Sequence, residues 1–168
     1  LAEGAVREAR ERVFTALRNS NFRLSPARIT VNLAPADRKK GGTGYDLPLA
    51  VGLLAASGLL PETAASGYYL AGELSLTGEV KPVPGILPLA ILARDSGAKG
   101  MLVPQENARE AAVVEGLAVY PMQSIAQAAA FLAGQLHMEP FVPGPDDAGN
   151  SPEGFAAFSG NYALDFID

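Results

Sequence analysis

A glycine closes each of three successive helical patterns in the second half of the chain. Glycine is favoured there because it adopts the left-handed conformation in which the last carbonyl groups of a helix find partners. The helical patterns occupy residues 86–96, 105–115 and 124–134, and the closing residues are Gly97, Gly116 and Gly134. The short apolar runs between them, predicted to be strands, occupy residues 100–103 and 117–120. This alternation predicts one domain of mixed fold, class α/β (α+β).

The first half of the chain adds two helices and one strand. Apolar residues recur at three- and four-residue steps over 2–19, which predicts an amphipathic helix. Residues 28–33 alternate apolar and polar side chains, as a half-buried strand does. After a glycine-rich loop, Asp46 is expected to cap a helix that runs to about Ser57.

Two local patterns predict a hairpin turn and the start of a helix. Thr77 and Gly78 stand between the apolar runs 68–76 and 79–83, which predicts a β-hairpin with these runs as its arms. Ser124, followed three residues later by Gln127, predicts a capping box at the start of the last helix.

Charge is divided unevenly along the chain, although the formal net charge is only −5. The first 40 residues hold nine basic and four acidic side chains, whereas residues 138–168 hold six acidic and no basic ones. Arg38, Lys39 and Lys40 stand together in the basic part and are the candidate contacts to nucleic-acid phosphates. A solvated helix face and a solubilising tail are the simpler explanation of the same pattern.

Residue types suited to metal or thiol chemistry are scarce. The chain has no cysteine and a single histidine, His137, so no metal site is expected.

No apolar stretch is long enough to span a bilayer and no signal-peptide pattern is present, so we expect a cytoplasmic protein that does not contact membranes. A Walker phosphate loop is absent as well. Serine and lysine both occur, so a Ser–Lys dyad stays open from the residues alone.

Several segments carry a family resemblance together. They are Gly-Glu-Leu-Ser-Leu-Thr-Gly-Glu-Val at 72–80, Lys-Pro-Val-Pro-Gly-Ile-Leu-Pro at 81–88, Gly-Met-Leu-Val-Pro-Gln-Glu-Asn at 100–107, and the segments 6–13, 28–37 and 45–50. Over about residues 1–134 the chain resembles the Lon-protease-like domain, most closely the version at the amino end of magnesium-chelatase-like AAA+ ATPases of the ComM (YifB) family. The resemblance implies the Lon-like fold, which also forms the second domain of a small-subunit ribosomal protein.

Peptidases of this fold use a serine at the start of the helix after the glycine loop and a lysine in the segment after the hairpin. The resemblance places Asp46 at the serine position and Leu87 at the lysine position. Neither a nucleophilic hydroxyl nor an amine base is then present, which implies no catalytic residues and no peptidase activity in this segment. A peptidase with a shifted dyad, with Ser75 and Lys81 among the candidates, is one alternative.

The resemblance also implies how the whole protein is organised. Residues 1–137 are expected to form the Lon-like domain without its first strands, which the family pattern places upstream of this chain. Residues 138–168, rich in proline and glycine, are expected to be a linker toward an AAA+ module outside this chain. The aromatic residues that recur there at three- and four-residue steps, as if to dock one face, are Phe155, Phe158, Tyr162 and Phe166.

The function that the resemblance implies is a non-catalytic accessory domain that supports ring assembly or DNA handling. The full protein is expected to be an AAA+ ATPase and DNA helicase, a homo-hexamer that performs ATP-dependent branch migration in natural transformation. No cofactor is expected in this segment, whereas ATP and magnesium are expected in the AAA+ module. The expected partners are that module and DNA. A module for oligomerisation only is the second alternative.

Overall fold

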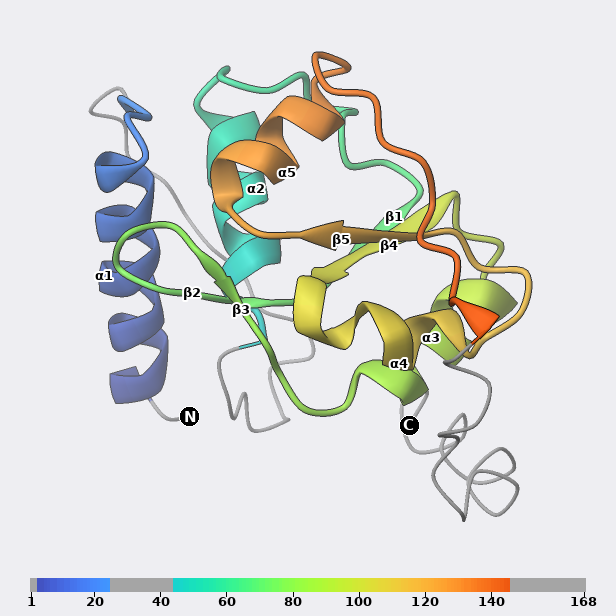
Figure 1. Ribbon diagram of the computed structural model, residues 1–168. Coiled ribbons are helices and arrows are strands. Elements are labelled where there is room, and N and C mark those ends of the chain that lie inside the picture. The colour runs from blue at the N-terminus through green and yellow to red at the C-terminus, as the bar shows by residue number, and fades with distance from the viewer. Residues whose placement is uncertain (1–2, 25–43, 146–168) are drawn as a thin grey trace.

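A three-stranded parallel sheet separates two layers of helices in the computed structural model, which describes residues 3–24 and 44–145 (Figure 1). The helices are α1 (Glu3–Asn19), α2 (Asp46–Ala56), α3 (Ile86–Asp95), the 3-10 helix η1 (Gln105–Asn107), α4 (Ala108–Ala112) and α5 (Ile125–Leu132). The strands are β1 (Tyr68–Leu70), β2 (Glu73–Leu74), β3 (Val80–Lys81), β4 (Gly100–Pro104) and β5 (Val119–Met122).

The strand β4 lies at the centre of the sheet, with β1 and β5 parallel to it on either side. Helices α2 and α5 lie on one face of the sheet and α3 and α4 on the other, while α1 stands to one side next to α2 (Figure 1). Because both faces are covered, all five residues of β4 are buried and its sequence is an unbroken apolar run. This arrangement confirms the predicted mixed α/β class.

Alternate side chains of the sheet enter two separate cores, as the two-residue period of a strand requires. Leu102 and Met122 belong to the core formed with α1, α2 and α5. Met101, Val103 and Val119 belong to the core formed with α3 and α4. The sheet therefore lies between the two cores and contributes side chains to both.

The hairpin around Gly78 is present but shorter than predicted. Its arms are β2 and β3, with Leu74 opposite Val80. The prediction that 68–76 forms one arm was wrong, because β1 pairs with β4 in the other sheet. The chain changes sheets near Gly72, where a Cβ would lie only 2.8 Å from Val80 Cγ1, so the absence of a side chain allows the two segments to approach.

Replacement of Gly78 by alanine is expected to lower the free energy of unfolding by about 2–3 kcal/mol, because strain and crowding add. Gly78 has φ 87°, and a Cβ there would overlap Ser20 Oγ and meet Ile125 Cγ2 at 3.2 Å. The matched control is Gly116→Ala, since Gly116 has φ 84° with nothing within 4 Å. That variant should lose only about 1 kcal/mol. Urea denaturation followed by circular dichroism measures both, and equal losses would contradict the crowding.

The predicted helix ends are confirmed at Gly97 and Gly134, which directly follow the caps of α3 and α5, whereas Gly116 lies beyond the end of α4 at Ala112. Gly97, Gly116 and Gly134 have φ values of 71°, 84° and 77°. Ser124 Oγ accepts a hydrogen bond from Gln127 N at 3.1 Å, which is half of the predicted capping box. The other half is displaced, because Gln127 Oε1 accepts from Gln123 N.

Two predicted elements differ from those observed. The helix predicted over 105–115 is a 3-10 turn followed by α4, which ends at Ala112. The strand predicted over 117–120 is β5, whose bounds are shifted because the pairing of Val119 with Met101 decides the register. The shift of the strand thus depends on a contact with a segment that is not its neighbour in the chain.

Contacts with the cores continue beyond the predicted domain boundary at residue 137. Met138 packs against the core of α1, α2 and α5, and Phe141 packs against the other core. Phe141 N also donates a hydrogen bond to Val119 O at 2.7 Å. The predicted strand 28–33 and the aromatic residues of 155–166 lie outside the described residues. In the part of the chain that is described, no helix combines the length and the apolar character needed to cross a membrane.

Candidate functional site

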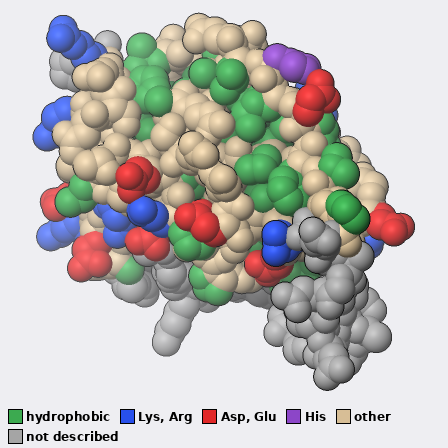
Figure 2. Space-filling model, in the orientation of Figure 1, with side chains coloured by type: hydrophobic (Ala, Val, Ile, Leu, Met, Phe, Trp, Pro, Cys, Tyr) green, Lys and Arg blue, Asp and Glu red, His purple; other side chains and the backbone are tan. Residues whose placement is uncertain are grey.

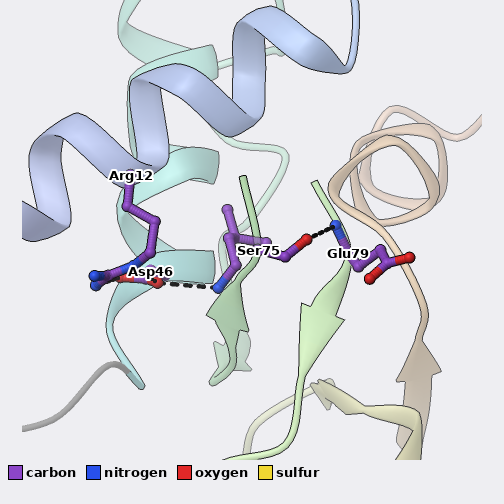
Figure 3. Close-up of polar contacts among 5 residues, drawn as sticks. Arg12, Asp46, Ser75 and Glu79 are labelled. Carbon is purple, nitrogen blue, oxygen red and sulfur yellow. Dashed lines mark hydrogen bonds and ion pairs between the residues drawn. The ribbon is translucent and has the colours of Figure 1, made fainter. Parts of the chain in front are cut away.

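The carboxylate of Asp46 is fully buried and is held by three hydrogen-bond donors (Figure 3). From α1, Arg12 Nε donates to Oδ2 at 2.7 Å and Nη2 donates to Oδ1 at 2.8 Å. From β2, Leu74 N donates to Oδ2 at 3.0 Å. This carboxylate therefore ties α1 and β2 to the first residue of α2.

Asp46 was predicted to cap α2, and this prediction was wrong. The residue before the helix is Tyr45, which makes no side-chain capping bond, and Asp46 is itself the first helical residue. Its carboxylate is directed to α1 and β2 because a bidentate guanidinium and a strand amide supply stronger partners for a buried charge. An acidic group in this first turn is also favoured by the helix dipole.

Electrostatics supports a structural role for the pair. The hydrogen bond to Asp46 raises the pKa of Arg12 above its ordinary value, against the lowering effect of burial. The Arg12 side chain is 22% exposed and that of Asp46 is 0% exposed, so the carboxylate has no access to solvent. A buried carboxylate engaged by three donors cannot act as the hydroxyl nucleophile of a Ser–Lys peptidase.

Sequence reasoning missed Arg12. One signal was available, because Arg12 stands three residues after Ala9 and four before Ala16, on the side of the helix that meets the core. An arginine at such a position is stabilised by an acidic partner when its charged end is taken out of solvent. That partner is Asp46, which is 34 positions away along the chain.

Leu87 lies in the first turn of α3 and packs partly buried against the core of α3 and α4. Its backbone N–H donates to Glu110 Oε1 at 3.2 Å. The other oxygen of Glu110 accepts from Asn107 Nδ2, and the buried Asn107 side chain also bonds both backbone groups of Val83. The position assigned to a lysine base is therefore a hydrocarbon in a network that holds the start of α3.

Ser75 and Lys81, named for a shifted dyad, engage different groups of the hairpin. Ser75 Oγ accepts from Glu79 N at 3.1 Å (Figure 3). The same oxygen lies 3.0 Å from Thr77 Oγ1. Lys81 Nζ pairs with Glu79 Oε2 at 2.8 Å. The hydrogen bond to Glu79 raises the pKa of Lys81, whereas a lysine that acts as a base needs a lowered pKa.

The other candidate residues are placed as follows. Arg38, Lys39 and Lys40 lie outside the described residues. His137 is exposed and its Nε2 lies 2.9 Å from Glu139 Oε1. Over 3–24 and 44–145, no group of three or more His, Cys, Asp or Glu side chains could hold a metal ion.

Comparison with known proteins identifies the family. A family model described as subunit ChlI of Mg-chelatase matches residues 1–107, which is more than half of the chain. The chain belongs to this family. Two relatives within this magnesium-chelatase-like group are similar over most or all of the chain. Competence protein ComM of Haemophilus influenzae is 38% identical over 168 residues, 100% of this chain and 32% of the relative. The protein YifB of Escherichia coli is 41% identical over 148 residues, 88% of this chain and 29% of the relative.

The magnesium-chelatase-like chain is also similar to Lon protease 2 of Bacillus subtilis, at 34% identity over 109 residues, 64% of this chain and 18% of the relative. The resemblances to the ComM (YifB) family and to Lon proteases, expected from the sequence, are thus confirmed. The chain spans about a third of the length of ComM and YifB.

Proposed function

We propose that this chain is a non-catalytic accessory domain of a magnesium-chelatase-like AAA+ ATPase, where it supports ring assembly or DNA handling. The observation that carries the proposal is the burial of the Asp46 carboxylate and its hydrogen bonds. At the position where peptidases of the Lon fold are expected to hold a serine, this chain has a buried carboxylate engaged by Arg12 and Leu74. A site whose nucleophile position is occupied by a structural ion pair suits a scaffold better than a peptidase.

The proposal extends to the whole protein. The relative from Haemophilus influenzae, similar over all of this chain, is named a competence protein. We assign the whole protein ATP-driven motor work on DNA during natural transformation, as a homo-hexamer in the cytoplasm. ATP and magnesium are assigned to an AAA+ module that residues 138–168 would join to this domain, and Arg38, Lys39 and Lys40 are the proposed phosphate contacts.

Incubation of the 168-residue chain with casein and a serine-reactive fluorophosphonate probe tests the non-catalytic part. We expect neither cleavage of casein nor labelling by the probe, because Asp46 and Leu87 supply no hydroxyl and no amine. Bacillus subtilis Lon protease 2 serves as the positive control for the substrate. Cleavage that disappears in Ser75→Ala or in Lys81→Ala would contradict the proposal and establish the shifted dyad.

A further inference from the structure

The outward face of α1 carries a row of arginines around an open hollow. The side chains that line it recur at three- and four-residue steps, so they follow one side of the helix: Arg7, Arg10, Glu11, Phe14, Thr15 and Arg18. The hollow measures about 630 Å³. The hollow is open to solvent and not an enclosed cavity, so a base would reach Phe14 from the outer side of α1. We call Arg7, Arg10, Phe14 and Arg18 the α1 basic face.

The arginines of the α1 basic face are exposed and available. Among the described residues, Arg7, Arg10 and Arg18 make no ion pair, whereas Arg12 is engaged by Asp46 and Arg94 by Asp95. Among the described residues that line the hollow, one is acidic, Glu11, and three are arginines, so these side chains together carry a positive excess. In Figure 2 the left edge of the molecule, where α1 lies, carries most of the Lys and Arg side chains visible in that view. Unpaired guanidinium groups in a row attract a polyanion.

Phe14 adds an aromatic ring to this charge. It is partly buried against the core, and Arg10 Cζ lies 5.6 Å from the centre of its ring. A cation over an aromatic ring is the combination on which unpaired bases stack in proteins that bind single strands. An acidic protein segment would use the charge but not the ring.

The spacing of the arginines suits a phosphate backbone. At 1.5 Å per residue, Arg7 and Arg18 are about 16 Å apart along the helix axis, with Arg10 between them. Successive phosphates of one strand are about 3.4 Å apart along a duplex axis and farther apart in an extended strand, so this length meets several of them.

We propose that the α1 basic face binds single-stranded nucleic acid, with phosphates on Arg7, Arg10 and Arg18 and a base in the hollow beside Phe14. This inference rests on the DNA-handling part of the proposed function and names a surface for it. The contact depends on backbone charge and on stacking, so it has no sequence preference of the kind that base-edge hydrogen bonds give.

Fluorescence anisotropy with a labelled oligothymidine of about 16 nucleotides tests the inference on the 168-residue chain at about 50 mM salt. Arg10→Gln should weaken binding about tenfold, because it removes a charge-assisted contact. The triple variant Arg7→Gln, Arg10→Gln and Arg18→Gln should weaken it further, with the slope of log K against log salt reduced by about 0.7 for each lost phosphate contact. Unlabelled polyglutamate should displace the oligonucleotide poorly, because it offers no bases to stack.

Arg94→Gln is the matched control, because it removes one charge from an exposed arginine on α3 and should leave binding unchanged. Circular dichroism confirms that each variant is folded. Binding that resists the triple variant but is lost on replacing Arg38, Lys39 and Lys40 by alanine overturns this inference and leaves the DNA-handling proposal in place. No binding by the unmodified chain overturns both. Displacement by polyglutamate equal to that by unlabelled oligothymidine overturns the nucleic-acid assignment in favour of an acidic protein partner.

Discussion

Replacement of Asp46 by alanine is expected to lower the free energy of unfolding by about 3–5 kcal/mol, the loss found when one partner of a buried ion pair is removed. The substitution leaves the Arg12 guanidinium partly buried without its partner and leaves Leu74 N–H without an acceptor. It also removes the group that joins α1 and β2 to α2. Urea denaturation of the variant and the unmodified chain, followed by circular dichroism, measures the difference.

A double-mutant cycle separates the ion pair from the burial of the side chain. The cycle compares Arg12→Met, Asp46→Leu and the double variant; no charge is left unpaired in the double variant, but Leu74 N–H still lacks an acceptor, so the double variant should recover only part of the stability lost in Asp46→Leu. Asp46→Asn is the intermediate case, because its amide oxygen can still accept from Leu74 N while the charge is lost. A loss below about 1 kcal/mol for Asp46→Ala, the level of an exposed pair, would contradict the structural role of this site.

Leu102→Ala is expected to lower the free energy of unfolding by about 2–5 kcal/mol. Leu102 is 0% exposed at the middle of the central strand β4, and it lies in the same buried cluster as Leu54 of α2 and Ile125 of α5. Truncation to alanine removes apolar contacts within this cluster and leaves a cavity that the paired strands on either side cannot close. The midpoint of urea denaturation gives the effect.

The matched control for this truncation is Leu76→Ala, because Leu76 is 55% exposed in the hairpin connection. Its backbone carbonyl still accepts from Asn19 Nδ2 after the substitution. The control should change the stability by no more than about 0.5 kcal/mol. Equal effects of the two substitutions would show that the sheet is not the centre of the fold.

Most local features of the fold could be predicted from short stretches of sequence. The left-handed glycines at 97, 116 and 134, the hairpin turn at Gly78 and the cap at Ser124 are all observed. Each depends on residues within a few positions, where backbone geometry and side-chain hydrogen bonds act directly. The partners of the strands could not be predicted in the same way. Residues 68–70 pair with β4, about 30 positions away, rather than with the nearby hairpin arm.

At the candidate site, too, the residue types could be predicted from the sequence, whereas their contacts could not. The family resemblance placed Asp46 and Leu87 at the two dyad positions, and the residue types alone excluded a serine and a lysine there. The ion pair of the Asp46 carboxylate with Arg12 could not be predicted, because no local pattern connects the two residues. The network of Glu110 and Asn107 at the start of α3 was missed for the same reason.

The sequence by itself determined the left-handed glycines that follow α3 and α5 and the place where the hairpin turns, because these depend on residue type and on neighbours along the chain. Only the tertiary structure decided that β1 lies beside β4, that Arg12 closes on Asp46, and which side of α1 is left as the α1 basic face. Those outcomes depend on which surfaces meet when apolar faces are buried, and burial joins residues that are distant in the chain.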